Sequence, residues 1–341
     1  MKANTESRRE EVLRVSGLQT HFITEQGVIK AVNGVDFSLR RGEILGLVGE
    51  SGSGKSVTGF SIMGLIDPPG KIHSGSIRLG GTELVGLSEK SLRPLRGVRM
   101  AMIFQDPMMT LNPVMRVADQ MIEAITVHER VPRKQAMLRA RAALVKAGIP
   151  APDERLRAYP HELSGGMRQR VAIATAILHR PDVIIADEPT TALDVTIQGQ
   201  ILAEVQRLAR DEGVALVWIT HDLSVVAGLA DHICVMYAGR VVESGTTDQV
   251  LDHPAHPYTL GLIESLPGQG EQGKPLKQIP GMTPSLLGLD DGCAFRTRCA
   301  YASEICQTPP QRRRWADGQT ASCFHPCRVT EHDAAEREVR S

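Results

Sequence analysis

An eight-residue glycine-rich segment limits the folds open to this chain more than any other feature: Gly49, Glu50, Ser51, Gly52, Ser53, Gly54, Lys55 and Ser56. It fits the pattern G-x-x-x-x-G-K-[ST] and stands between an apolar run, Ile44–Val48, and a helical pattern. Glycines let consecutive backbone N–H groups point inward, and the helix N-terminus adds positive potential. The segment predicts a phosphate-binding loop, in which Lys55 reaches the β- and γ-phosphates and Ser56 ligates Mg²⁺.

Two acidic residues follow a second apolar run and supply the expected partner of that loop. Residues 183–186 read as a buried strand, with Asp187 and Glu188 at its carboxyl end, where parallel sheets present their ligands. We expect Asp187 to hold Mg²⁺ through its water shell and Glu188 to polarise the attacking water. Without a phosphate loop nearby, such a pair would more often cap the next helix.

Five apolar runs bounded by Gly, Pro or Asp predict core strands: Ile44–Val48, Met100–Phe104, Val183–Ala186, Ala215–Ile219 and Ile233–Tyr237. Four helical patterns fall between them: Lys55–Leu65, Arg133–Lys146, Gly165–Leu178 and Val195–Arg210. The alternation of strands and helices predicts an α/β fold with a mostly parallel sheet. Because residues 118–178 show helical patterns and no strand, we expect a helical subdomain inserted between two core strands.

The charge balance favours no nucleic-acid partner. The chain holds 39 Lys and Arg against 39 Asp and Glu. Its most basic stretch, residues 129–170, has ten Lys or Arg and four Asp or Glu, a net charge of +6. A nucleic-acid footprint is one interpretation, and the solvated faces of amphipathic helices are the other. The second is favoured because few aromatic residues are available for stacking on bases.

Nothing in the sequence indicates a membrane span or a secretion signal. No run approaches the ~20 apolar residues that cross a bilayer, and the N-terminal segment is charged. We therefore expect the chain to stay in the cytosol.

The segment LSGGMRQR, Leu163–Arg170, resembles the signature of ATP-binding cassette (ABC) ATPases, in the variant found in oligopeptide and dipeptide importers. Other motifs of that family stand in the right order. Gln105 matches the Q-loop, residues 191–194 (TALD) the D-loop, and His221 in WITHD the switch histidine. The HPYT motif at residues 256–259, followed by a Cys-rich end, is similar to the C-terminal extension of these importers. The resemblance covers roughly residues 12–330.

The resemblance implies a fold class and a division of the chain. The fold is an α/β P-loop NTPase, an ABC nucleotide-binding domain with an inserted helical subdomain and a small Cys-rich C-terminal extension. We expect the ABC domain at residues 1–255, its helical subdomain at about 106–180 and the extension at 256–341.

The same resemblance implies an ATPase that energises uptake of dipeptides or oligopeptides through partner membrane subunits. Its implied partners are a paralogous ATPase subunit in a heterodimer, two membrane permease subunits and, indirectly, an extracytoplasmic substrate-binding protein. The implied location is the cytoplasmic face of the inner membrane. The alternatives are a nickel or glutathione importer, a soluble ABC ATPase acting on nucleic acid, and a module that holds ATP without useful turnover.

Residue roles follow by matching motifs. Glu188, His221 and Gln105 are the implied catalytic residues, with His221 contacting the γ-phosphate and Gln105 sensing Mg²⁺ and touching the membrane subunits. The implied Mg²⁺ residues are Ser56, Gln105 and Asp187. Besides the glycine-rich segment, the implied ATP-binding residues are Val57, Ser164, Gly165, Gly166, Asp194 and Phe22.

Three of these assignments carry a further implication. In the family the signature residues at 164–166 cap ATP bound to the opposite subunit, so two half-sites require a dimer. Val57 stands where many cassettes have Thr, so its contact with the α-phosphate would come from the backbone. Phe22 is the nearest candidate for the aromatic residue that stacks on adenine, and a core position is the alternative.

Four late cysteines, Cys293, Cys299, Cys306 and Cys323, are spaced C-x5-C-x6-C-x16-C, and Cys327 follows. Four thiolates could hold a [4Fe–4S] cluster or tetrahedral zinc, although the usual C-x2-4-C zinc pairs are missing. Buried free thiols are the third alternative. The resemblance to peptide importers favours the cluster.

Overall fold

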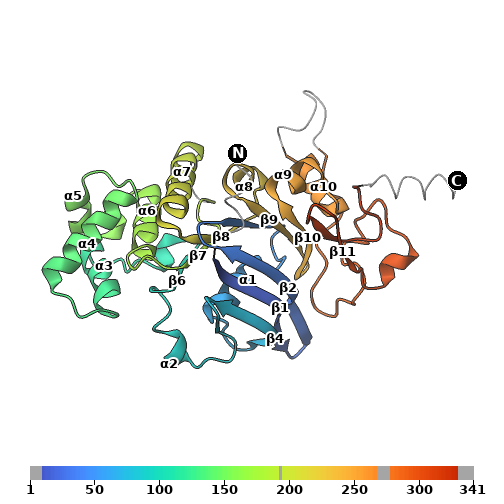
Figure 1. Cartoon of the computed structure of the whole chain (residues 1–341), viewed down its shortest axis with the longest axis horizontal. Helices are drawn as coiled ribbons and strands as arrows, with labels where there is room; N and C mark the ends of the chain where they lie inside the picture. Colours follow the sequence, from blue (N-terminus) through green and yellow to red (C-terminus); the bar gives the residue numbers. More distant parts are fainter. Residues whose placement is uncertain (1–9, 192–193, 267–276, 329–341) are drawn as a thin grey trace.

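An eight-stranded sheet runs through the centre of the molecule in the computed structural model, which describes residues 10–191, 194–266 and 277–328 (Figure 1). Its strands lie in the order β11 (Arg312–Arg314), β12 (Thr320–Ser322), β10 (Arg240–Thr246), β9 (His232–Tyr237), β3 (Ile44–Val48), β8 (Ala215–Thr220), β7 (Val183–Asp187) and β6 (Met100–Ile103). The five strands from β9 to β6 are parallel, and β10, β11 and β12 add antiparallel pairs.

The predicted core strands are confirmed, with small shifts at their ends. Every residue of β3, β7 and β8 is buried, as expected for parallel strands that are covered on both faces. Strand β6 ends one residue before the predicted Phe104, and β7 extends to Asp187. The first carboxylate is therefore part of the strand.

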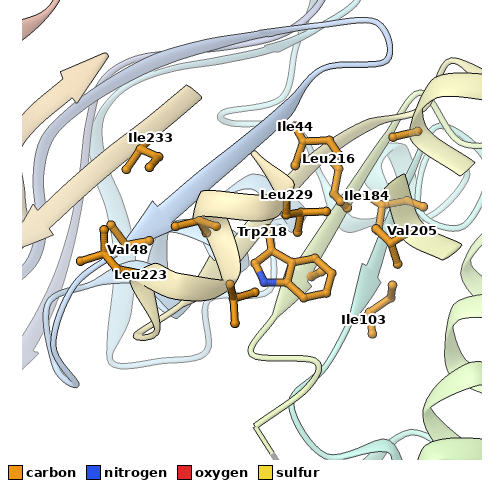
Figure 2. Packing of buried hydrophobic residues seen from close by; sticks show 14 of the residues in the cluster. Ile44, Val48, Ile103, Ile184, Val205, Leu216, Trp218, Leu223, Leu229 and Ile233 are labelled. Atoms are coloured by element: carbon orange, nitrogen blue, oxygen red, sulfur yellow. The ribbon is translucent and has the colours of Figure 1, made fainter. Parts of the chain in front are cut away.

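The central sheet separates two hydrophobic clusters. Successive side chains along β8 point alternately into one cluster and the other. Leu216 and Trp218 belong to the cluster packed against α7 (Val195–Glu212) and α8 (Leu223–Leu229), as Figure 2 shows around Trp218. Val217 and Ile219 belong to the other cluster, which the N-terminal strands cover.

A second, four-stranded antiparallel sheet was not predicted from the sequence. Its order is β2 (Gly27–Arg40), β1 (Glu11–Thr24), β4 (Gly70–Leu79) and β5 (Thr82–Glu83). The register between β1 and β2 shifts at several points, for example between Val15 and Leu18. These bulges break the period-2 alternation that would have revealed the strands.

The inserted helical subdomain is confirmed. Its helices are α3 (Val117–Thr126), α4 (Arg133–Lys146), α5 (Pro152–Arg157) and α6 (Gly165–Ala176), with a 3-10 turn, η3 (Pro160–Glu162). They enclose a hydrophobic cluster of their own. Side chains of the basic stretch pair with nearby acids: Arg139 with Glu129 at 2.5 Å and Arg141 with Asp153 at 2.9 Å.

The remaining elements connect these parts. They are α1 (Lys55–Met63), α2 (Glu89–Leu92), η2 (Pro107–Met109), α9 (Thr247–Asp252), α10 (Pro257–Glu264) and η4 (Glu304–Gln307). Helix α1 ends two residues before the predicted Leu65 because Gly64 adopts a left-handed conformation, and α6 ends two residues before Leu178.

The C-terminal region, which begins at residue 256, lies against the central sheet, at the opposite end from the helical subdomain (Figure 1). Strand β12 pairs with β10, and Tyr258 and Phe295 are buried in the cluster that contains Trp218. In the part of the chain that the structure describes, no helix is long and apolar enough to cross a membrane.

We expect the substitution Trp218→Ala to lower the free energy of unfolding by about 3–5 kcal/mol, because it leaves a large cavity against α7 and α8. The matched control is Leu138→Ala on α4, where the side chain is 61% exposed and the expected change is within about 0.5 kcal/mol. Urea titration of the full chain followed by circular dichroism measures both. Equal losses in the two variants would contradict this packing account.

Candidate functional site

The glycine-rich segment forms a tight loop between β3 and α1, and two of its glycines have no room for a side chain. Gly49 has a φ of 152°, and an added Cβ would lie 2.2 Å from the carbonyl oxygen of Met236. Gly54 has a φ of 99°, and its Cβ would lie 2.3 Å from the carbonyl oxygen of Ala31. Only glycine satisfies both restrictions, so the sequence pattern is a direct consequence of the packing.

The side chain of Lys55 lies inside the loop and is hydrogen-bonded to its backbone. Its Nζ donates to the carbonyl oxygens of Gly49 at 2.7 Å and Glu50 at 2.9 Å. Burial lowers the pKa of Lys55, and the carboxylates of Glu188, Asp187 and Glu50 oppose that shift. The ammonium group of Lys55 lies at the start of α1, where a phosphate group could replace its carbonyl partners.

Ser56 and Asp187 meet across the sheet. The Ser56 hydroxyl donates to Asp187 Oδ1 at 2.9 Å, joining the first turn of α1 to the end of β7. Burial raises the pKa of Asp187, and the charge of Glu188 adds to that shift. A hydroxyl and a carboxylate side by side are ligands that suit a hard cation such as Mg²⁺.

Glu188 lies one residue beyond β7, and three side chains converge on its carboxylate. Gln105 Nε2 donates to Oε2 at 3.3 Å, and Thr191 Oγ1 donates to the same oxygen at 3.1 Å. His221 Nδ1 lies 3.2 Å from Oε1. Glu188 has a φ of 44°, which is uncommon for a residue with a side chain and occurs most often at functional sites. The structure therefore brings the three expected catalytic residues together.

A cavity of about 940 Å³ lies over the loop and carries most of the expected site residues. Gln105, Glu188 and His221 line it, together with Phe22 and residues 50–57. Val57 is half-buried and also packs against the cluster beneath the N-terminal sheet. Thr191 of the expected D-loop also lines the cavity, and residues that motif reasoning missed complete the lining: Thr24, Ile29, Ala31, Pro69, Leu262 and Leu286.

The signature residues lie apart from this lining, at the start of α6. Ser164 caps the helix by accepting from the N–H of Met167 at 3.3 Å. Gly166 lies so close to α7 that an added Cβ would come within 2.7 Å of Ile197 Cγ2. Asp194 is exposed and starts α7. Residues 192–193 of the expected D-loop lie outside the described residues.

The C-terminal region contacts the loop through residues that the motif search did not assign. Glu50 donates its N–H to the Tyr258 hydroxyl at 2.8 Å, and its carboxylate pairs with Arg298 at 2.6 Å. Thr283 donates to the same carboxylate at 3.0 Å. The Arg298 guanidinium holds the pKa of Glu50 below its usual value. Tyr258 belongs to the HPYT motif, which was the one sequence signal for this contact.

The late cysteines gather in the C-terminal region as free thiols. Cys306 is buried, and Cys293, Cys299, Cys323 and Cys327 are partly buried. The N–H of Cys293 donates to the carbonyl oxygen of Cys306 at 2.9 Å. Burial raises the pKa of Cys323 to about 12, and the neighbouring thiols of Cys293 and Cys299 add to it. Among the residues with a described position, no group of three or more His, Cys, Asp or Glu is arranged to hold a metal ion.

This combination of fold and phosphate loop defines a P-loop ATPase. Residues 32–191 match the family described as ABC transporter, and residues 242–306 match the oligopeptide/dipeptide transporter C-terminal region. The chain belongs to the ATP-binding proteins of ABC transporters, in the oligopeptide/dipeptide group. Its cofactors are accordingly ATP and Mg²⁺.

Curated relatives match over almost the whole chain. The oligopeptide transport ATP-binding protein OppD of Escherichia coli is 46% identical over 321 residues, which cover 94% of this chain and 95% of the relative. The dipeptide transport ATP-binding protein DppD of the same organism is 46% identical over 316 residues, which cover 92% and 97%.

Solved structures match the cassette portion. The dimeric ATP-binding cassette MJ0796 bound to ADP and Pi superposes with a TM-score of 0.63 at 25% identity, covering 69% of this chain and 98% of that one. CbiO1 of Clostridium perfringens gives a TM-score of 0.61 at 28% identity, covering 72% and 92%. The predicted ABC fold is confirmed.

Proposed function

We propose that this chain is the ATP-hydrolysing subunit of an importer for dipeptides or oligopeptides. The observation that carries the proposal is that Lys55 and the phosphate loop share one cavity with Glu188, Gln105 and His221. The match of residues 242–306 to the peptide-transporter C-terminal region supports the substrate class. The printed names of the relatives OppD and DppD, both peptide transport proteins, point the same way.

One group of residues binds the phosphates and Mg²⁺, and another group promotes the attack of water. The loop amides and Lys55 would bind the β- and γ-phosphates, while Ser56, Asp187 and Gln105 would hold hydrated Mg²⁺, which would offset phosphate charge. Glu188 orients a water and accepts its proton as the water oxygen attacks the γ-phosphorus and the bond to the β-phosphate oxygen breaks, which releases ADP and phosphate. His221 contacts the γ-phosphate and keeps Glu188 in place. Phe22 stacks on adenine from the wall of the cavity.

A second ATPase subunit completes the site. Ser164, Gly165, Gly166 and Asp194 are not among the residues that line the cavity of their own chain. Their place at the starts of α6 and α7, where the positive end of a helix dipole favours an anion, supports a role toward ATP on the opposite subunit. The related cassette MJ0796 is dimeric. We propose a heterodimer with a paralogous ATPase subunit, as the family resemblance implies.

A groove of about 580 Å³ provides a docking place for a membrane permease subunit. Its lining residues include Phe104, Leu111, Met115, Ala172 and His179. Phe104 in its lining directly precedes Gln105, which donates to Glu188, so a permease segment bound in the groove could respond to nucleotide at Glu188. Two permease subunits would place the chain at the cytoplasmic face of the inner membrane, with an extracytoplasmic binding protein acting through them.

The proposed division of the chain keeps the ABC domain at 1–255, with the helical subdomain at about 106–180, and the extension at 256–341. The separate hydrophobic cluster of the subdomain supports the first boundary. The pairing of β12 with β10 supports an extension that packs onto the ABC sheet.

We also propose that Cys293, Cys299, Cys306 and Cys323 hold a [4Fe–4S] cluster. The chemistry of four neighbouring thiols fits such a group, although their described positions do not surround a single metal position. Bound, the cluster would supply a structural link within the extension.

Replacing the attacking-water residue by Glu188→Gln should lower ATP turnover of the reconstituted importer by about 10²-fold or more, because the carboxylate is lost as a general base. Nucleotide-dependent dimers of the ATPase subunits should still form. The control is Glu204→Gln on α7, whose carboxylate pairs with Arg207. Phosphate release and size-exclusion chromatography measure the two effects. Turnover in Glu188→Gln equal to that of Glu204→Gln would refute the catalytic assignment.

Anaerobically purified full-length protein should contain about four iron atoms and four acid-labile sulfides per chain if the cluster is present. Cys323→Ser should lose them, whereas Cys234→Ser should keep them because Cys234 is buried in β9. A wild-type protein without iron, sulfide or a visible chromophore would end the cluster proposal.

A further inference from the structure

One side chain of the phosphate loop is held from outside the cassette. Glu50 is the first variable residue of the loop, and three residues of the C-terminal region contact it. Tyr258 binds its backbone N–H, while Thr283 and Arg298 bind its carboxylate. The Arg298 pairing is two-pronged, with Nη1 2.6 Å from Oε2 and Nη2 3.0 Å from Oε1. Such forked pairs fix orientation as well as distance.

Arg298 is itself held in a rigid setting. Its side chain is only 5% exposed. Its Nε donates to the carbonyl oxygen of Pro280 at 2.8 Å, and Nη1 lies 3.3 Å from the Tyr237 hydroxyl. The guanidinium also lies 5.9 Å from the ring centre of Tyr237 and 6.0 Å from that of Phe295. These contacts fix the guanidinium before any nucleotide arrives.

Glu50 links Arg298 to the phosphate-binding lysine, Lys55, through its backbone carbonyl group. The carbonyl oxygen of Glu50 accepts from Lys55 Nζ at 2.9 Å, and the N–H of Ser53 donates to the same carbonyl at 3.2 Å. Leu262 and Leu286, also from the C-terminal region, line the cavity itself. The C-terminal region is therefore in direct contact with the loop and with the cavity that the loop borders.

We infer that Arg298 is a positioning residue for the nucleotide site of its own chain: through Glu50 it fixes the phosphate loop in its binding conformation. This inference rests on the proposed function, because it takes the loop as the ATP site. Removing Arg298 would leave the Glu50 carboxylate without its main counter-charge beside the phosphates. The unpaired negative charge would repel ATP, and the loop would lose its external anchor.

The test compares Kd values of the full-length chain for a fluorescent ATP analogue with Mg²⁺. Arg298→Gln should raise Kd about tenfold, a typical size for coupling between neighbouring sites. The double variant Glu50→Gln with Arg298→Gln should bind more tightly than Arg298→Gln alone, because it removes the unpaired charge. The matched control is Arg296→Gln, which breaks an ion pair with Asp290 inside the same region and should leave Kd unchanged.

The outcomes separate the inference from its alternatives. Equal Kd values for wild type, Arg298→Gln and Arg296→Gln would overturn it, as would a double variant that binds no better than Arg298→Gln. If Arg298→Gln does not fold, Arg298→Lys decides: a Kd raised several-fold supports positioning by the forked pair, and a wild-type Kd overturns it. A wild-type chain that does not bind the analogue would instead refute the proposed function.

Discussion

Two backbone carbonyl oxygens set the shape of the phosphate loop, and the rest of the site depends on that shape. Met236 belongs to β9 of the central sheet, one residue before the end of that strand, and Ala31 belongs to β2 of the N-terminal sheet. Each carbonyl lies where the Cβ of a larger residue at Gly49 or Gly54 would stand. The loop is thus pressed between the two sheets. Its tight curve buries Lys55 and sets Ser56 opposite Asp187.

Each part of the fold contributes a different restraint to the same cavity. The parallel strands β3 and β7, with β8 between them, deliver the phosphate loop and the carboxylates at the same edge of the sheet, where the carboxyl ends of the strands lie. The N-terminal sheet brings Phe22, and the segment before the helical subdomain brings Gln105. The C-terminal region anchors Glu50. A shift in the position of any of these parts would alter the nucleotide site through a few direct contacts. This arrangement suits a subunit that couples ATP hydrolysis to movement in its partners.

The central strands and the motif residues could be predicted because their signals are local. Fully buried parallel strands are short apolar runs, and the glycine pattern follows from close packing at Gly49 and Gly54. The N-terminal sheet was missed because register shifts in β1 interrupt its alternation. The pairing of Glu50 with Arg298 joins residues 248 positions apart, and nothing in either segment indicates the other. Tertiary contacts of this kind leave no local pattern.

Under the proposed function, this nucleotide site drives the uptake of peptides. The most direct test is ATP hydrolysis by the chain assembled with its partner ATPase and permease subunits in proteoliposomes, with the extracytoplasmic binding protein added together with a peptide, nickel or glutathione in turn. The account predicts that dipeptides or oligopeptides raise turnover and that nickel and glutathione do not. Stimulation by nickel or glutathione, with no response to any peptide, would contradict it.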